Sequence, residues 1–137
     1  MIELGCGVGA MGLALSQICS KVLLTDGEES TLDIARLNVG ERENVVIRRL
    51  SWEEEGEVER ILEEEGAFDL VVGCDLLYYS VDVEELFRCV LRLIETSSSS
   101  LFLHSHIIRL PQGEEELLKV GNKLGLDHYV IVRSSEK

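Results

Sequence analysis

Three glycines at alternate positions follow a short apolar segment at the start of this chain. Gly5, Gly7 and Gly9 come directly after residues 2–4, a pattern typical of a strand that enters a tight turn and then a helix. Glycine suits such a turn because the chain must bend sharply and let a ligand lie against bare backbone. The amide groups at the start of the following helix can then bind that ligand. The motif therefore predicts a strand–turn–helix unit that holds a ligand.

An acidic residue ends the next predicted strand. Residues 21–25 form a mainly apolar segment, and Asp26 follows it directly. A carboxylate at the end of the second strand of such a unit can accept hydrogen bonds from both hydroxyl groups of a ribose. Together, the glycine motif and Asp26 predict a cofactor built on a nucleoside.

Strand and helix patterns alternate along the rest of the chain. Helices are expected over residues 10–19, 30–39, 54–65, 83–95 and 114–124, and strands over 2–4, 21–25, 45–50, 68–74, 101–107 and 126–132. Ser30 with Asp33 has the spacing of a capping box, and Asp82 is placed to cap the fourth helix. The alternation predicts an α/β fold in a single domain over residues 1–137, with a doubly wound, mostly parallel sheet of about six strands and helices on both faces.

Ligands of such sheets bind outside the carboxyl ends of the strands, where the strand order reverses. The segments that follow predicted strands should therefore meet along one edge of the sheet. These segments are Gly5–Gly9, Asp26, Leu50–Trp52, Asp75–Tyr79 and His104–Arg109.

The charge of the chain narrows the class of partner. The formal net charge is −13, from 26 acidic residues against 13 Lys and Arg, and residues 53–65 alone carry eight acids and one Arg. Such a surface repels a phosphate backbone, so no nucleic-acid partner is expected, and a basic protein or peptide is favoured. The acidic run itself is interpreted first as the solvated face of a helix.

The cysteines and the apolar segments indicate the compartment. Cys6, Cys19, Cys74 and Cys89 lack the spacing of a metal site or a redox pair, which indicates reduced thiols in a cytoplasmic, or also nuclear, protein. No apolar run reaches the length that spans a membrane, so no membrane partner is expected.

Two cofactors fit the glycine motif. Residues 7–12 match the G-x-G-x-x-G fingerprint of dinucleotide-binding proteins, which would favour NAD. The frame that begins at Gly5 fits the preceding strand better and places Glu3 two residues before the first glycine. A carboxylate there suits a ligand with positive charge, such as S-adenosyl-L-methionine. Trp52 follows the third strand, where an adenine could lie against it, although a half-exposed core tryptophan is an equal alternative.

Four motifs in register with the predicted strands carry a family resemblance. They are E-L-G-C-G-V-G, L-T-D, L-S-W and V-V-G-C-D-L-L-Y, and they cover the chain to about Arg109. Together they resemble the seven-β-strand, or class I, S-adenosylmethionine-dependent methyltransferases. More narrowly, they resemble methyltransferase family 16, the protein-lysine methyltransferases with a D-x-x-Y motif. The resemblance implies a Rossmann-like fold and methyl transfer from S-adenosyl-L-methionine to a lysine side chain of a protein substrate.

The resemblance also assigns residues to the site. The cofactor would contact Glu3, Gly5, Cys6, Gly7, Asp26, Trp52 and Cys74. Asp75 and Tyr78 of the D-x-x-Y motif would shape the entrance for the lysine, with Asp75 orienting the ammonium. Tyr79 is a candidate second wall, although a core role is favoured. No metal site is expected, and His104 and His106 are given a packing or substrate-rim role.

The resemblance implies segments at both ends that this sequence lacks. Family members carry an N-terminal segment over the cofactor and a seventh strand beside the sixth. Without them, apolar surface and strand edges would be exposed, so marginal stability, self-association and weak activity are expected. Two alternatives of another class therefore stay open: a binding or scaffold module with this fold, and an NAD-linked oxidoreductase.

Overall fold

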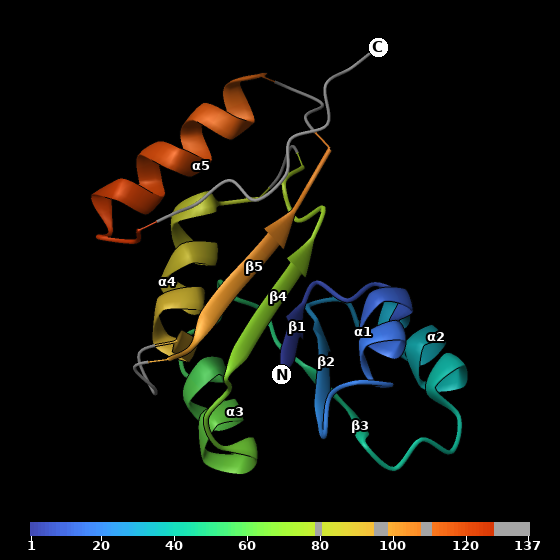
Figure 1. Cartoon of the computed structure of the whole chain (residues 1–137). Helices are drawn as coiled ribbons and strands as arrows, with labels where there is room; N and C mark the ends of the chain where they lie inside the picture. Colours follow the sequence, from blue (N-terminus) through green and yellow to red (C-terminus); the bar gives the residue numbers. More distant parts are fainter. Residues whose placement is uncertain (79–80, 95–98, 108–110, 128–137) are drawn as a thin grey trace. The chain divides into compact units, whose positions relative to one another are not determined.

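The computed structural model describes residues 1–78, 81–94, 99–107 and 111–127 of the 137-residue chain. The chain forms two compact units, Met1–Ile107 and Ile108–Lys137. The first unit alternates strands and helices in the order β1 (Ile2–Leu4), α1 (Ala10–Leu15), β2 (Val22–Asp26), α2 (Glu29–Val39), β3 (Val45–Arg49), α3 (Glu57–Glu65), β4 (Leu70–Cys74), α4 (Val83–Ile94) and β5 (Leu101–Ser105), as Figure 1 shows. The second unit contains α5 (Pro111–Lys123).

The strands of the first unit form one parallel sheet of five strands in the order β3-β2-β1-β4-β5. The chain moves outward from β1 to β2 and β3 and then crosses back to β4, on the other side of β1. Within β1, Glu3 pairs with Leu24 of β2 on one side and with Val72 of β4 on the other. The strand order thus reverses at β1 and β4, and a ligand crevice is expected outside their carboxyl ends. The parallel α/β fold predicted from the sequence is confirmed.

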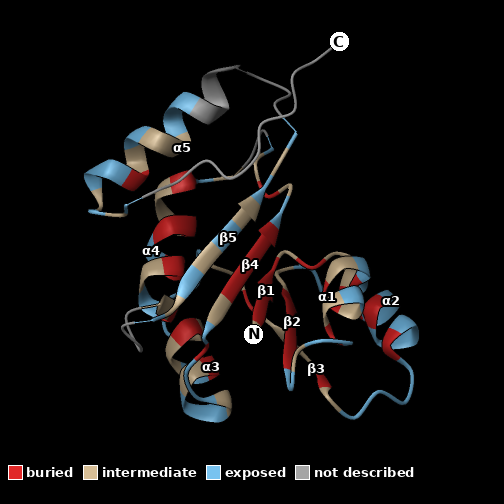
Figure 2. Cartoon of the chain, viewed as in Figure 1, coloured by how far each residue is buried: buried red, intermediate tan, exposed pale blue. Residues whose placement is uncertain are grey.

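Helices cover both faces of this sheet. α1 and α2 pack against β2 and β3, and α4 packs against β4 and β5 with α3 beside it. Because right-handed crossovers join parallel strands, the reversal of strand order puts α1 and α2 on one face and α3 and α4 on the other (Figure 1). The inner strands are therefore buried on both sides, as the red segments of Figure 2 show, and Ile2, Leu4 and Leu23 are 0% exposed.

The two predicted helix caps have different outcomes. Asp82 caps α4 as predicted, because its Oδ1 atom accepts hydrogen bonds from the backbone amides two and three residues on, at 2.9 and 3.2 Å. The capping box of Ser30 and Asp33 is wrong, since α2 already begins at Glu29 and both residues lie inside the helix. The Asp33 carboxylate instead pairs with the Arg36 guanidinium at 2.7 Å.

Some element boundaries also differ from the sequence prediction. The helix predicted over residues 10–19 ends at Leu15, where the Ser16 hydroxyl donates a hydrogen bond to a carbonyl of the preceding turn at 2.8 Å and competes with the helical backbone. α5 begins three residues earlier than predicted, at Pro111, a residue type well suited to the first turn of a helix. Of the sixth strand, predicted over residues 126–132, residues 126 and 127 are not in a strand and the other five lie outside the described residues.

Gly12 lets α1 approach the sheet closely, so replacing it should be costly. A Cβ atom on Gly12 would lie 2.1 Å from Leu24 Cδ2 and 2.3 Å from Glu3 Oε2. Helix propensity alone favours Gly12→Ala by about 1 kcal/mol, but overpacking of this kind costs roughly 1–3 kcal/mol. We expect Gly12→Ala to lower the free energy of unfolding, measured by urea denaturation. Gly27→Ala is the matched control, because its Cβ would meet no atom nearer than 4.0 Å; a more stable Gly12→Ala protein would contradict the prediction.

Candidate active site

The glycine turn after β1 uses its glycines for different purposes. Gly5 and Gly7 have φ angles of 57° and 54°, in the left-handed region that favours glycine. A Cβ atom on Gly5 would lie 2.6 Å from Leu76 Cδ2, whereas one on Gly7 would meet nothing within 4 Å. Gly5 therefore makes room for a neighbouring side chain. Gly7 leaves an open stretch of backbone against which a ligand can lie.

The Asp26 carboxylate is tied directly to this turn. Its Oδ2 atom accepts a hydrogen bond from the Gly7 amide at 2.9 Å, and its Oδ1 atom accepts one from the Glu28 amide at 3.0 Å. The Cys6 amide donates to the Thr25 carbonyl at 2.8 Å, which fastens the turn to the end of β2. An ionised carboxylate has about four acceptor sites, so Asp26 retains acceptor capacity for ribose hydroxyl groups.

Glu3 is a buried acid beneath the turn. It is 2% exposed, and its Oε2 atom has no hydrogen-bond partner among the described residues. Burial raises the pKa of Glu3 to about 7, the Gly12 amide opposes this increase, and the Asp26 carboxylate adds to it. The pKa of the Cys6 thiol is raised to about 12, mainly by burial and then by Glu3 and Asp26, so this thiol is not a nucleophile at neutral pH.

Trp52 lies close to the glycine turn from the β3 side. The Cη2 and Cζ3 atoms of its indole ring are 3.8 and 3.9 Å from the position of a Cβ atom on Gly5. The half-buried side chain also lines a cavity of about 320 Å³ together with Val58 of α3 and Cys89 of α4. A contact between Trp52 and adenine stays a prediction.

Asp75 adopts an unusual backbone conformation at the end of β4. Its φ angle is 57°, and it is the one residue other than glycine with a positive φ among those that the structure describes. The Asp75 amide donates a hydrogen bond to the Ser105 carbonyl of β5 at 2.7 Å. Residues in this conformation cluster at functional sites, where the surrounding structure holds them in place. Asp75 is therefore the strongest candidate for a residue that acts on the substrate.

Cys74 and Tyr78 flank Asp75 at the surface. The exposed Cys74 sulfur accepts a hydrogen bond from the Ser105 hydroxyl at 3.3 Å. Tyr78 is 59% exposed, and its phenol pKa is raised, first by partial burial and then by the carboxylates of Asp26 and Glu28. Tyr78 thus lies within electrostatic range of Asp26. The candidate second wall, Tyr79, lies outside the described residues.

Two histidines line the same edge of the sheet beside Asp75. The rings of His104 and His106 stack with centroids 5.0 Å apart, and Phe102 stacks on His104 at 5.8 Å. The pKa of His104 is lowered to about 4 by burial and by His106, while Asp75 opposes this change, so the imidazole is neutral at physiological pH. The two rings pack on one another, and the expected packing or substrate-rim role stays a prediction. No group of three or more metal-ligating side chains occurs among the described residues.

Leu76 is the site residue that sequence reasoning missed. It is 2% exposed, and its side chain fills the space between Gly5 of the turn and Gly73 of β4. A Cβ atom on Gly73 would lie 2.4 Å from Leu76 Cδ1. A glycine inside a strand is a signal of close approach, so Gly73 could have indicated this contact. The side-chain amide of Asn38 was also missed; it donates a hydrogen bond to the Val8 carbonyl of the turn at 2.9 Å.

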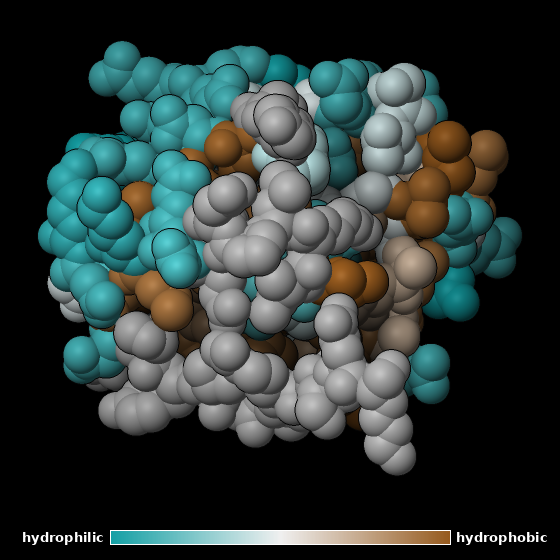
Figure 3. All heavy atoms as spheres, turned by 90° about the horizontal axis from the view of Figure 1, so that it is seen from above, coloured by the Kyte–Doolittle hydropathy of each residue, from teal (hydrophilic) through white to brown (hydrophobic). Residues whose placement is uncertain are grey.

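The surface combines many charged groups with scattered apolar side chains. Figure 3, a view from above Figure 1, shows brown apolar areas separated by teal hydrophilic ones. Exposed apolar side chains of the described residues include Val8 of the glycine turn and Ile34 and Leu37 of α2. Within the described residues, none of the helices is long and apolar enough to cross a membrane.

The fold and the arrangement at its edge define a class I methyltransferase. A family model described as lysine methyltransferase matches residues 1–120, and the chain therefore belongs to this family. S-adenosyl-L-methionine is its cofactor. A ligand that combines a ribose with positive charge fits three features of the site. They are the open Gly7 backbone, the Asp26 carboxylate and the buried Glu3 Oε2 atom, which has no hydrogen-bond partner within the described part of the chain. The family match corrects the dinucleotide interpretation of residues 7–12 and the expectation of NAD that went with it.

Known relatives agree with this assignment. Protein N-lysine methyltransferase METTL21A of Danio rerio is 29% identical over 139 residues, which cover 94% of this chain and 60% of the relative. The chain thus spans less than two thirds of that relative. Among solved structures, the ribosomal protein L11 methylase of Lactobacillus delbrueckii subsp. bulgaricus has a TM-score of 0.69 and 16% identity, covering 98% of this chain and 64% of that chain. A SAM-dependent methyltransferase of Anabaena variabilis has a TM-score of 0.64 and 23% identity, covering 74% and 42%. These structural likenesses show the fold.

The buried Glu3 should make stability depend on pH. Its pKa is raised to about 7 in the folded chain, so folding binds a proton between the unfolded value near 4.5 and pH 7. Stability from this group is thus present below about pH 4.5 and is lost as the pH rises through 7. We expect Glu3→Gln to gain roughly 2–3 kcal/mol relative to the parent chain between pH 4.5 and pH 8. Urea denaturation across this range measures the change, with the exposed Glu43→Gln as control; a stability difference independent of pH would contradict it.

Proposed function

We propose that this chain transfers a methyl group from S-adenosyl-L-methionine to the side-chain amine of a lysine in a protein substrate. The observation that carries the proposal is Asp75, held in a left-handed conformation at the end of β4. The next residue, Leu76, packs against the glycine turn. Tyr78 lies close enough to Asp26 for its phenol to be affected by that carboxylate. The family match and the protein-lysine methyltransferase of Danio rerio support lysine as the acceptor.

Several residues at the carboxyl ends of β1 to β4 would hold the cofactor. The Gly7 backbone offers an open surface, Asp26 offers acceptors to ribose hydroxyl groups, and Trp52 offers an aromatic face to the adenine. Cys74 would place its backbone beside the cofactor. When bound, the cofactor supplies a methyl group on a positively charged sulfur, which an amine can attack. Glu3 beneath the turn supplies compensating negative charge as its proton is lost near pH 7.

The substrate amine must reach the methyl group in its neutral form. A lysine with a pKa near 10.4 costs about 4.6 kcal/mol to deprotonate at pH 7, and a dry site beside positive charge lowers that cost. Asp75 orients the arriving ammonium by charge and hydrogen bonding, and Tyr78 forms one wall of the entrance. His104 is neutral at this pH and adds no positive charge that would repel the substrate. The chain's contribution is thus alignment of the amine.

The partner that fits this surface is a basic protein segment. The net charge of −13 attracts lysine-rich substrates and repels nucleic acid. We infer a cytoplasmic or nuclear protein, in keeping with the free thiols of all four cysteines. The alternative that the sequence leaves open, a binding module with this fold and no turnover, is distinguished from the proposed enzyme by the assay below.

A methyl-transfer assay tests the proposed reaction. The purified chain is incubated with tritiated S-adenosyl-L-methionine and a protein extract, and the labelled products are hydrolysed to amino acids. Label in methyllysine supports the proposal, with a full-length relative as the positive control. Label in another amino acid or in a small molecule would assign a different acceptor. Cofactor binding without any label would favour the binding module.

Removing the Asp26 carboxylate should weaken cofactor binding. A hydrogen bond to a charged acceptor contributes roughly 1.5–3 kcal/mol, so Asp26→Ala should lower affinity about ten- to a hundredfold. Calorimetric titration with S-adenosyl-L-methionine measures the change. Asp33→Ala is the control, since its exposed side chain lies on α2 and pairs only with Arg36 among the contacts described. Equal affinities for the parent chain and Asp26→Ala would remove Asp26 from the ribose site.

Neutralising Asp75 should reduce turnover and leave cofactor binding intact. Asparagine is the informative replacement because it tolerates a left-handed backbone and keeps one acceptor oxygen. We expect Asp75→Asn to lower the methyl-transfer rate roughly a hundredfold, the scale of a lost orienting contact. Calorimetry on the same protein should give an unchanged affinity for S-adenosyl-L-methionine. Full turnover by Asp75→Asn would show that the charge of this residue does not orient the amine.

A further inference from the structure

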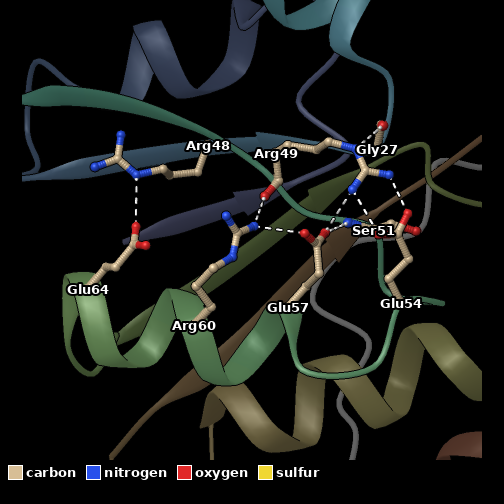
Figure 4. Close-up of polar contacts among 8 residues, drawn as sticks. All are labelled: Gly27, Arg48, Arg49, Ser51, Glu54, Glu57, Arg60 and Glu64. Carbon is tan, nitrogen blue, oxygen red and sulfur yellow. Dashed lines mark hydrogen bonds and ion pairs between the residues drawn. The ribbon is translucent and has the colours of Figure 1, made fainter.

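A polar network joins the segments that follow β2 and β3, as Figure 4 shows. The Arg49 side chain donates through Nε to the Gly27 carbonyl at 3.1 Å and through Nη1 to Glu57 Oε2 at 3.3 Å. The Leu50 amide donates to the Asp26 carbonyl at 3.1 Å. Hydrogen bonds thus connect two loops: the Asp26 loop, which follows β2, and the Trp52 loop, which follows β3.

Glu57 is the shared acceptor of this network. It is the first residue of α3, and its side chain is 14% exposed. Besides Arg49, its Oε2 atom accepts a hydrogen bond from the Ser51 amide at 2.8 Å. Its Oε1 atom accepts one from Arg60 Nη2 at 2.7 Å, and Arg60 in turn donates to the Arg49 carbonyl at 3.3 Å. One carboxylate therefore fixes two guanidinium groups and the backbone next to Trp52.

The other acids of the run 53–65 do not share this arrangement. Glu54 pairs with Arg49 from an exposed position, and Glu64 pairs with Arg48 at 3.2 Å near the other end of α3. Glu63 is exposed on the same helix. Among these side chains, only Glu57 combines burial with a hydrogen bond to the backbone of the Trp52 loop. Glu65 is also buried, but it pairs with Lys21 and Arg48 at the far end of α3. The acidic run, interpreted from sequence as a solvated face, thus contains two buried acids, and of these Glu57 is the one bonded to the backbone next to Trp52.

We propose that Glu57 is a positioning residue for the adenosine half of the cofactor. It acts through Arg49 and the Ser51 amide, which hold the Asp26 loop and the Trp52 loop at a fixed separation. A ribose and an adenine joined by one bond can use both loops only at a matching separation. Pre-organisation of this kind raises affinity because the bound arrangement exists before the ligand arrives. The inference rests on the proposed use of S-adenosyl-L-methionine by these two loops.

Ligand titration separates this role from a general effect on stability. We expect Glu57→Ala to weaken S-adenosyl-L-methionine, S-adenosyl-L-homocysteine and 5′-methylthioadenosine by the same factor, about tenfold, because all three share the adenosine half. The KM for S-adenosyl-L-methionine should rise while kcat at saturation is retained. Glu57→Gln keeps an acceptor for the Ser51 amide but loses the charge that the arginines face, so its loss should be smaller. Glu63→Ala is the matched control and should bind as the parent chain does.

Trp52 provides a readout that does not depend on turnover. It is the only tryptophan of the chain, so its fluorescence reports this loop alone. Without ligand, the Trp52 emission maximum should shift to longer wavelength in Glu57→Ala as the loop loosens, and not in Glu63→Ala. If Glu57→Ala is unfolded at the assay temperature, the affinities and the Trp52 emission of Glu57→Gln are compared with those of the parent chain instead.

The outcomes distinguish the two proposals. Equal affinity of the parent chain and both Glu57 variants, with unchanged Trp52 emission, would overturn the positioning role alone. A loss for S-adenosyl-L-methionine but not for 5′-methylthioadenosine would also overturn it, because the effect would then lie at the methionine half. A parent chain that binds none of the three ligands would overturn the proposed function and this inference together.

Discussion

The side chain of Leu76 connects the two halves of this site. It occupies the space that Gly5 and Gly73 leave empty, so the turn after β1 and the segment after β4 are packed on one another. A Cβ atom added to Gly5 would lie 2.6 Å from Leu76 Cδ2, and one added to Gly73 would lie 2.4 Å from Leu76 Cδ1, so a side chain at either position would force Leu76 to move. Asp75, with its positive φ, directly precedes this packed side chain. The glycine turn and the segment that begins at Asp75 are therefore packed together through one side chain.

The two carboxylates beside the glycine turn, Asp26 and Glu3, have contrasting environments. Asp26 accepts hydrogen bonds from two backbone amides, which hold its side chain against the glycine turn. Glu3 is nearly inaccessible to water, and burial raises its pKa to about 7. The first acid is held in place by the backbone. The second is poised to become charged when positive charge arrives above it. Similar residues thus differ in behaviour because of the groups around them.

Much of the fold and of the site could be predicted from the sequence. The parallel sheet and the meeting of Gly7, Asp26, Trp52 and Asp75 at one edge follow from strand order, which periodicity and the glycine motif reveal. Sequence could not show that Gly5 serves Leu76, because this contact joins segments about seventy residues apart and involves a side chain of ordinary type. Nor could it separate Glu57 from its acidic neighbours, since composition does not show which acid turns inward. The Ser30 capping box failed because α2 begins at Glu29 with Glu28 at the cap position, two residues before Ser30.

The left-handed backbone of Asp75 limits which residues could ever replace it. Aspartate, asparagine and glycine tolerate this conformation, and of these only aspartate carries a negative charge. Glutamate would keep the charge but fits the backbone poorly, and asparagine would keep the backbone but not the charge. No single exchange preserves both properties. Any substitution at this position therefore loses either the negative charge or the left-handed backbone conformation, so two independent requirements favour aspartate.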